Sequence, residues 1–387
     1  MKIVSIEPTP SPNVMKLNLD ESLPPGKSYN FSLASKEQAP GYIQKLLMIE
    51  GVIGVFQVLD FISLERHPKA DWQTVLSKAR EALGEADGKS QMAPVAGEAE
   101  RTAAESFGEV TVYIQKLKGI PIQVKCVKDG EEVRVGLPER FKEAVMKAQS
   151  ATTNLVFERK WEEQSPRYGN LQEVGEQVAE EIAAAYDEVR LKSLVEAAFA
   201  PENERQTKRE GISVQDVLSA LDHPEWEKRY AALEQMEPTL EAIPVLDKAL
   251  GDEKTAIRRL AVVYLGLIGE KEVLPYLYRA LKDPSAIVRR TAGDSLSDMG
   301  DPDATPAMCE ALRDKNKLVR WRAARFLYEV GDETAIPALK EAVNDPEFEV
   351  RMQAQIALER IERGEEASGT VWQQMTRSIS GEKKGND

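Results

Sequence analysis

Cysteine and histidine are scarce in this chain of 387 residues, which has two of each. Cys126 and Cys309 lie too far apart in the sequence to indicate a disulfide framework or a cluster of metal ligands. His67 and His223 each stand directly before a proline, without a partner motif nearby. Two thiolates cannot complete a four-ligand iron–sulfur cluster, and a zinc site is not expected either. The sequence therefore predicts no metal and no cofactor.

Long apolar runs and a basic, apolar N-terminal leader are also missing, so we expect a cytoplasmic protein without membrane contact. The net charge of −14 opposes binding to nucleic acid, which depends on neutralising phosphates. No Gly-rich phosphate loop, nucleophile elbow or metal-binding motif occurs. We therefore expect no catalytic residues and no enzymatic activity.

The first region, residues 1–84, has the pattern of a small α+β domain. Pro8, Pro10 and Pro12 predict an extended lead-in to a strand at 14–19, because proline fixes φ and lacks a backbone donor. A second strand is expected at 26–31, a helix at 39–52, one strand over 52–66 and a helix over 71–84. In this last helix Asp71 is the expected N-cap, and the expected apolar stripe is Trp72, Val75, Leu76 and Ala79.

Residues 85–108 are small, polar and charged, which is typical of a linker. The second region, 109–200, begins with alternating apolar residues that predict three strands, with Asp129-Gly130 as a tight turn between the last two. A helix, a strand at 154–161 and one long helix from about 170 to 199 follow. The order resembles that of the first region, so a diverged second copy is a hypothesis that we keep open.

The third region, 213–364, is a repeat array with a period of 31 residues. Prolines 244, 275, 306 and 337 keep this spacing, and aspartates, arginines, alanines and leucines recur with it. Within each unit the apolar positions follow helical periodicity, and stacked helical pairs can bury a stripe that one pair cannot. The sequence predicts an all-α solenoid of about five helical hairpins after the two α+β domains, with a flexible tail at 365–387.

The 31-residue unit, shown in full by DPSAIVRRTAGDSLSDMGDPDATPAMCEAL at 283–312, resembles HEAT-like repeats of the short form also seen in phycobiliprotein lyases. The start EPTPSPNVMK, followed by GVIGVFQVLDFISL and Trp72, resembles the N-terminal domain of Nfu-type iron–sulfur scaffold proteins. Ser11 departs from the Asn usual in that family. The scaffold domain with its Cys-x-x-Cys pair has no counterpart here, so cluster chemistry is not carried over.

An Nfu-like N-terminal domain joined to HEAT-like repeats, without a scaffold domain, resembles the conserved virulence factor C family. The resemblance implies an accessory or regulatory role in a Gram-positive bacterium and no reaction. Two function classes stay open. The first is a non-enzymatic adaptor that binds a protein partner on the solenoid. The alternative is an accessory factor in iron–sulfur cluster assembly or delivery that acts through the Nfu-like domain.

Aspartates and arginines six residues apart recur in the repeats, and we predict that they form a structural ladder. Each Asp is expected to cap the second helix of its unit and to pair with an Arg of its own or an adjacent unit. A row of ligand-binding arginines is the other interpretation. The residues are Asp252, Arg258, Asp283, Arg289, Asp314, Arg320, Asp345 and Arg351.

One position after the ladder arginines, the equivalent residues are Arg259, Arg290 and Trp321, with Arg322 and Arg325 on the same helix as Trp321. If the second helices line the concave face, as in the family, these side chains form a positive groove. Arg and Trp are enriched among interface hot spots, so the groove is a candidate site for a protein partner with an acidic patch. A solvated helix face is the alternative.

Overall fold

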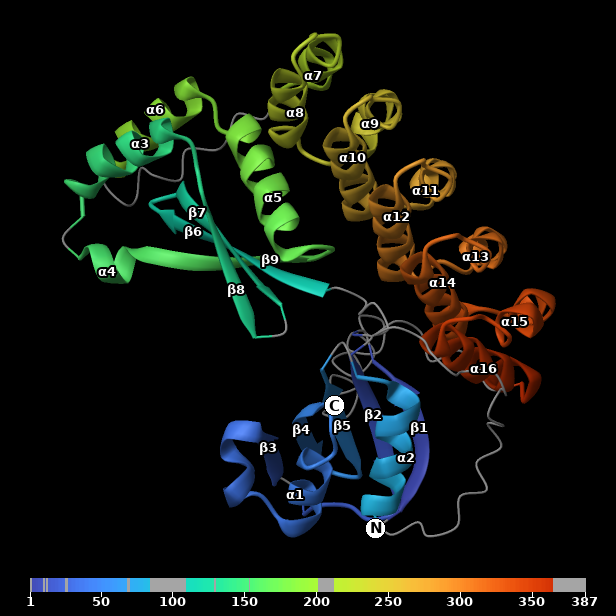
Figure 1. Ribbon diagram of the computed structural model, residues 1–387. Helices are drawn as coiled ribbons and strands as arrows, with labels where there is room; N and C mark the ends of the chain where they lie inside the picture. Colours follow the sequence, from blue (N-terminus) through green and yellow to red (C-terminus); the bar gives the residue numbers. More distant parts are fainter. Residues whose placement is uncertain are drawn as a thin grey trace, which may run out of the picture. The chain divides into compact units, whose positions relative to one another are not determined.

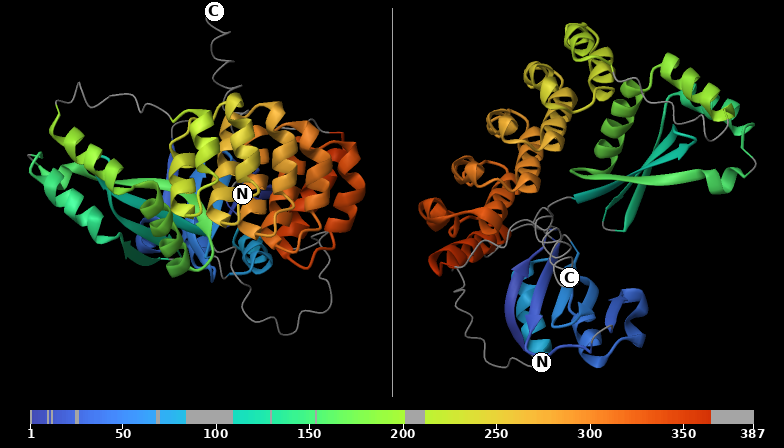
Figure 2. Two further views of the ribbon diagram at one scale, coloured as in Figure 1. Left: turned by 90° about the horizontal axis from the view of Figure 1, so that it is seen from above. Right: turned by 180° about the vertical axis from the view of Figure 1, so that it is seen from behind.

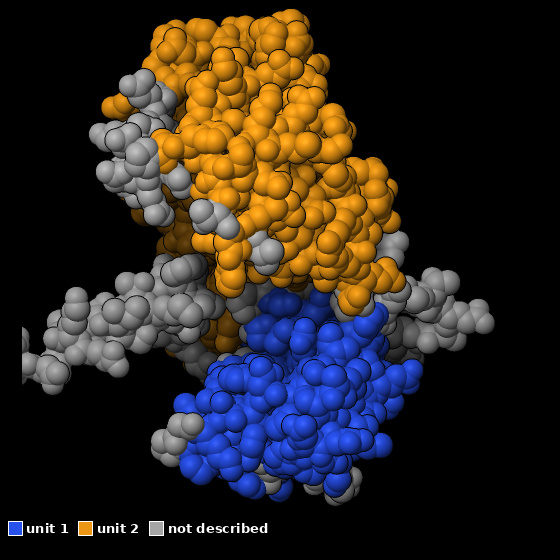
Figure 3. Space-filling view, turned by 90° about the vertical axis from the view of Figure 1, so that its left-hand side faces the viewer, with its two compact units in different colours: residues 1–108, 346–356 blue, residues 109–345, 357–387 orange. Residues whose placement is uncertain are grey.

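The computed structural model describes residues 2–9, 11, 13–24, 27–67, 70–83, 109–128, 130–152, 154–200 and 212–364. It consists of two compact units, which Figure 3 shows in different colours. Unit 1 contains residues 1–108 and 346–356, and unit 2 contains residues 109–345 and 357–387. The expected linker at 85–108 and the expected tail at 365–387 lie outside the described residues.

Unit 1 contains a five-stranded antiparallel sheet in the order β1-β2-β5-β4-β3. Its core side chains come from the strands and from the two helices, with Leu17, Ile62 and Trp72 fully buried. Pro8 ends the edge strand β1, where a missing backbone donor breaks no ladder. The elements are β1 Ile3–Pro8, β2 Val14–Leu19, β3 Ser28–Ser32, η1 Leu33–Gln38, α1 Gly41–Leu47, β4 Val52–Val58, β5 Phe61–Arg66 and α2 Trp72–Ala82.

The helix α2 confirms the sequence prediction in detail. The Asp71 side chain accepts a hydrogen bond from the Thr74 backbone N–H, and the buried residues of α2 are Trp72, Val75, Leu76 and Ala79. The single strand predicted over 52–66 is wrong, because the chain turns back at Leu59 and Asp60 to form the hairpin β4–β5. Leu59 takes a φ of 48°, which is unusual for a residue other than glycine, so sequence rules gave no turn signal there.

The second α/β domain, in unit 2, contains a four-stranded antiparallel sheet in the order β8-β7-β6-β9. The predicted tight turn is confirmed by the pairing of Lys128 with Glu131, and Gly130 has a φ of 81°. The helices α3, α5 and α6 pack on the face that carries the apolar core. The elements are β6 Glu109–Leu117, β7 Ile120–Lys128, β8 Glu131–Gly136, α3 Glu139–Gln149, α4 Leu155–Glu158, β9 Arg159–Tyr168, α5 Leu171–Ala185 and α6 Glu188–Phe199.

Two predictions for this domain are corrected. The strand expected at 154–161 begins five residues later, because Asn154 caps the short helix α4 instead. The long helix expected over 170–199 is two helices, because Asp187 accepts from the Arg190 N–H and starts α6 as an N-cap. The strand order also differs from that of unit 1, since β6, β7 and β8 form a meander whereas β2 and β3 are not neighbours. The sheets therefore do not support a duplicated domain.

The repeat region forms five helical hairpins, as predicted (Figure 1). The inner helices α8, α10, α12 and α14 contact one another in series, and α5 packs against α8 at the start of this row. Each repeat proline stands in the first turn of an outer helix. At this position the missing backbone N–H removes no hydrogen bond of the helix. Two further views show the same stacking (Figure 2).

The helical elements of this region are α7 Val214–Ala220, α8 Trp226–Glu234, η2 Leu240–Ala242, α9 Ile243–Ala249, α10 Thr255–Ile268, η3 Lys271–Val273, α11 Leu274–Ala280, α12 Ala286–Met299, η4 Pro302–Ala304, α13 Thr305–Ala311, α14 Lys317–Val330, η5 Glu333–Ala335, α15 Ile336–Ala342 and α16 Phe348–Glu362. Gly269 and Gly300 end α10 and α12 in the left-handed conformation, with φ of 70° and 60°. The last helix, α16, belongs to unit 1 up to Ile356 and to unit 2 from Ala357 onward.

Candidate partner-binding surfaces

The ladder arginines pair with the aspartate of the following repeat. Arg289 donates from Nε to Asp314 Oδ2 at 2.6 Å and from Nη2 to Asp314 Oδ1 at 2.9 Å. Its Nη1 donates to the backbone carbonyl of Asp283 in its own repeat, at 2.9 Å. Each guanidinium thus joins two repeats through a two-pronged ion pair, which is the strong form of such contacts. The same geometry holds for Arg258 with Asp283 and for Arg320 with Asp345.

The capping role predicted for the aspartates needs a correction. Asp283 Oδ1 accepts from the backbone N–H of Ser285, and Ser285 is itself the N-cap residue of α12. The aspartate therefore closes the turn just before the helix instead of satisfying the first helical N–H groups. Asp252 and Asp314 make the same contact two residues on.

The ladder begins one repeat earlier than the sequence spacing indicates. Arg229 of α8 donates to both carboxylate oxygens of Asp252, at 2.8 and 3.0 Å, although it stands two residues out of register with the later arginines. At the other end Arg351 donates to the Pro346 carbonyl at 2.9 Å, which matches the own-repeat contacts of the other arginines. A strict period of 31 missed Arg229 because the first repeat departs from the common length.

Arg259, the first residue of the predicted groove, lies against the second α/β domain. Its Nη2 donates to Glu181 Oε2 of α5 at 3.1 Å, and Arg167 of β9 binds the same carboxylate at 2.7 Å. Tyr230 of α8 reaches Glu181 at 3.5 Å. Burial alone would raise the pKa of Glu181, but Arg259 and Arg167 outweigh it and hold the pKa below the ordinary value. Glu181 is therefore a charged carboxylate enclosed by two arginines.

Arg290, the second residue, is covered by the end of β9. The ring of Tyr168 lies 4.0 Å from its guanidinium carbon, and 7% of the arginine is exposed. Burial lowers the pKa of Arg290, while Asp294 opposes that shift. Asp294 also lies 2.7 Å from Arg322 on the next inner helix. These contacts make a cation–π and ion-pair cluster rather than an open surface.

Trp321 and Arg325 are also buried, with 3% and 5% exposed. Arg325 pairs with Glu329 one turn later at 2.5 Å, and burial lowers the pKa of the arginine and raises that of the glutamate. The structure therefore brings the five predicted groove residues to the inner row, but it does not leave them as an accessible positive stripe. That part of the prediction is corrected: β9 and α5 cover Arg259 and Arg290, and acidic neighbours neutralise Arg322 and Arg325.

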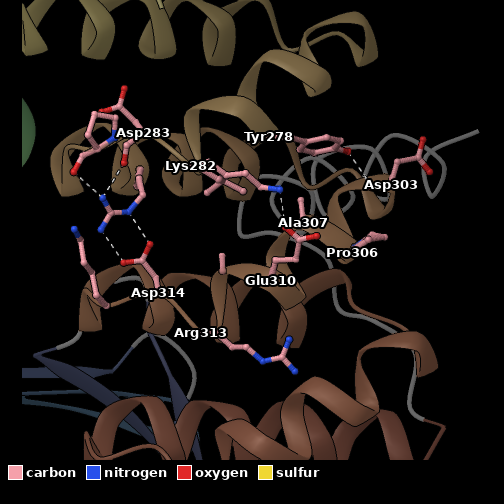
Figure 4. A pocket seen from close by; sticks show the side chains of 14 residues that line it. Tyr278, Lys282, Asp283, Asp303, Pro306, Ala307, Glu310, Arg313 and Asp314 are labelled. Carbon is pink, nitrogen blue, oxygen red and sulfur yellow. Dashed lines mark hydrogen bonds and ion pairs between the residues drawn. The ribbon is translucent and has the colours of Figure 1, made fainter.

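A pocket of about 690 Å³ lies between the outer helices α11 and α13 (Figure 4). Leu281, Ala307 and Ala311 supply apolar lining, and Lys282 and Glu310 face each other across it with 2.8 Å between Nζ and Oε2. The side chains of this pair are 71% and 64% exposed, so they are held loosely. The ladder group Asp283–Arg289–Asp314 forms one end of the pocket. The sequence gave no sign of this cleft, because it arises from the spacing between repeats.

Neither cysteine has surroundings that lower the pKa of its thiol below the ordinary value. Cys126 lies in the core of the second domain, and burial raises the pKa of its thiol. Cys309 on α13 is partly exposed, and burial followed by Asp332 raises the pKa of its thiol as well. Over the described residues, no three His, Cys, Asp or Glu side chains gather as metal ligands. The helices in this part of the chain are too short or too polar to cross a membrane.

Three family models match different parts of the chain. The N-terminal model of the Nfu/NifU scaffold proteins matches residues 4–88, the model described as "Virulence factor" matches 115–195, and HEAT repeats match 214–297 and 278–359. The first and third confirm the resemblances found in the sequence. The second model covers the domain for which the sequence suggested no family.

Conserved virulence factor C of Staphylococcus aureus strain NCTC 8325 is 48% identical over 378 residues, which are 97% of this chain and 99% of that protein. The chain belongs to the conserved virulence factor C family. The corresponding protein of Staphylococcus haemolyticus is 46% identical over 97% of this chain and 99% of its own length. The Bacillus subtilis protein YpgR is 57% identical over 98% of this chain and 99% of its own length.

Among solved structures, protein SAV1430 from Staphylococcus aureus is 38% identical over 21% of this chain and 99% of its own length, with a TM-score of 0.20. Membership of the conserved virulence factor C family, together with the HEAT repeats, is consistent with an adaptor or accessory role.

Proposed function

We propose that this member of the conserved virulence factor C family is a non-enzymatic adaptor, and that it binds a protein partner in the cleft between α11 and α13. The observation that supports this is the accessible 690 Å³ pocket, which combines an apolar floor with charged rims. A helical-repeat scaffold serves as a rigid frame when its repeat interfaces are fixed, and the buried ladder pairs fix them on both sides of this cleft.

The lining chemistry favours a peptide segment as the ligand. Lys282, Arg313 and Lys315 supply basic groups to the lining of the cleft, while Glu310 and Asp303 supply acidic groups. Apolar contact on Leu281 and Ala307 would contribute binding energy, and the charged rim would set the orientation of the segment. A partner segment with an acidic end toward Arg313 and Lys315 fits this distribution best, and Glu341 already pairs with Arg313 there at 2.6 Å.

The test uses the full-length protein as bait in a lysate of its native host, with bound proteins identified by mass spectrometry. Ala307→Arg fills the cleft, since Ala307 lines it and is partly exposed. Ala338→Arg is the matched control, because Ala338 stands 31 residues later, is equally half-buried and does not line the cleft. Loss of the same partner with Ala307→Arg alone supports the proposal. Equal recovery by both variants contradicts it.

Contact with the iron–sulfur assembly machinery through unit 1 is the second candidate. It is favoured by exposed apolar side chains on the Nfu-like domain: Val4 at 68%, Phe56 at 38% and Leu59 at 47% exposure. Phe56→Glu should abolish capture of an assembly protein while leaving any partner of the cleft bound. If this variant still captures such a protein, the exposed apolar side chains of unit 1 are not the contact surface.

A further inference from the structure

Residues 346–356 complete the core of unit 1. Met352 is 4% exposed and belongs to the buried cluster that also holds Ile62, Leu64 and Trp72. Phe348 and Ile356 are partly buried against the same cluster. The three side chains stand at positions i, i+4 and i+8 of α16, so they lie along one face of the helix. The Nfu-like domain thus accepts one apolar helix face as part of its interior.

A buried ion pair accompanies this apolar face. Arg66 at the end of β5 is 2% exposed, and its Nη2 donates to Glu349 Oε1 at 2.6 Å. Its guanidinium carbon lies 5.0 Å from the ring centre of Trp72, and its Nη1 donates to the Ala70 carbonyl. Burial lowers the pKa of Arg66, whereas Glu349 raises it. Burying a guanidinium to this extent destabilises the fold unless a carboxylate pairs with it. The site therefore favours a helix that carries an acidic residue at this position.

We propose that Arg66 and Trp72, together with the core surface around them, form a helix-binding site of the Nfu-like domain, and that a partner protein can occupy it. The required ligand is a helix with an acidic residue directly after the first of three apolar residues spaced by four. Residues 348–356 of this chain, FEVRMQAQI, show the pattern and fill the site. The partner helix competes with them for Arg66.

The segment enters the site through one ion pair and three apolar side chains. Helix-in-groove recognition generally relies on a comparable set of anchors, so a partner helix with the same anchors can replace it. The helix also continues to Glu362, and its residues from Ala357 onward belong to unit 2. When residues 348–356 leave the site, they therefore remain part of α16. This site is independent of the cleft between α11 and α13.

The test measures binding of a fluorescent peptide with the sequence of residues 346–362 to full-length protein by anisotropy. Wild type should bind it weakly, because its own helix occupies the site. Glu349→Lys places two positive charges together and should free the site, so that the peptide binds at least about tenfold more tightly. The double variant Arg66→Glu, Glu349→Lys restores an opposite-charge pair in the chain and should return binding to the wild-type level.

Specificity is tested with Arg66→Glu alone, which also frees the site. This variant should bind a peptide with Lys in place of Glu349 and should reject the unmodified peptide. Circular dichroism melts check that each variant is folded, and Glu349→Gln replaces Glu349→Lys if the lysine variant does not fold. Equal affinity of wild type and the Glu349 variant, or equal binding of both peptides by Arg66→Glu, overturns the proposal.

Discussion

Two rows of side chains in adjacent sequence positions have different environments in the same solenoid. Arg258, Arg289 and Arg320 each bind an aspartate 25 residues later, in the same geometry every time. Their immediate neighbours Arg259 and Arg290 bind a glutamate of α5 and a tyrosine of β9, which are not part of any repeat. The first row joins repeats to one another, and the second joins the repeats to a different domain.

The comparison shows which partners a repeated sequence can reveal. An interaction between repeats recurs with the period, so both partners are visible as rows. An interaction with a domain outside the array occurs once, and nothing at fixed spacing marks Glu181 or Tyr168. A row of arginines without a matching row of acidic residues can therefore have its partners in another domain, and it does not by itself indicate a solvent-exposed surface.

The largest effect is expected from breaking the first row. Asp283→Ala leaves Arg258 buried without its carboxylate and should lower the free energy of unfolding by about 3–4 kcal/mol. Urea denaturation of the full-length protein measures this. Asp222→Ala is the control, because the Asp222 side chain is 75% exposed in its pair with Lys248, and its curve should match wild type. Equal stability of the Asp283 variant and wild type would refute the ladder.

The next effect concerns the contact between the domain and the repeats. Glu181→Gln removes the charge between Arg167 and Arg259 and should cost about 2–3 kcal/mol at pH 7. The folded-state pKa of Glu181 lies below its ordinary 4.5, so the stabilisation is present above that pH and is lost as pH falls through the folded value. Urea curves of both proteins should therefore converge in acid. A difference that is constant down to low pH would contradict the assignment of a charged Glu181.

A smaller effect is expected at Tyr168. Tyr168→Leu removes the ring over Arg290 and should cost about 1 kcal/mol, while Tyr168→Phe keeps the ring and should cost only a few tenths. Burial raises the pKa of Tyr168 to about 12 from 10.0, so the unfolded state ionises first as pH rises. Wild type should therefore lose stability relative to the phenylalanine variant above about pH 10. If leucine and phenylalanine behave alike, the ring has no role.

The smallest effect is expected for the exposed pair across the cleft. Lys282→Ala should leave the melting curve unchanged, because both side chains of the pair are largely in solvent. The same variant should weaken binding of a partner that occupies the cleft. A destabilised Lys282→Ala protein would mean that the outer pairs contribute to the repeat interfaces as the ladder does.

Features with a local sequence signal or a fixed period could be predicted from the sequence, whereas features that occur once and have no strong local signal could not. The five hairpins, the N-cap Asp71 and the turn at Gly130 each have a nearby chemical signal. The hairpin at Leu59 and the break before α6 were missed, because a leucine with positive φ and an Asp inside a helical pattern are weak signals. The repeat pattern identified the residues of the candidate groove. It could not predict that β9 and α5 bury them, because these two elements are not part of the repeats.

The ladder also allows the solenoid to become shorter or longer by complete repeat units. Each arginine needs an aspartate from the next unit, and every internal unit supplies the same aspartate at the same place. Removing residues 283–313 would join α11 to α14 and present Asp314 to Arg258, so every remaining guanidinium would again find a carboxylate. Removing 30 or 32 residues would rotate the following helix by about 100° unless a helix or loop length changes with it, as in the first repeat, where Arg229 keeps its pair with an aspartate only 23 residues later. Insertions and deletions of one complete unit are therefore expected to be the ones that preserve every pair without further change.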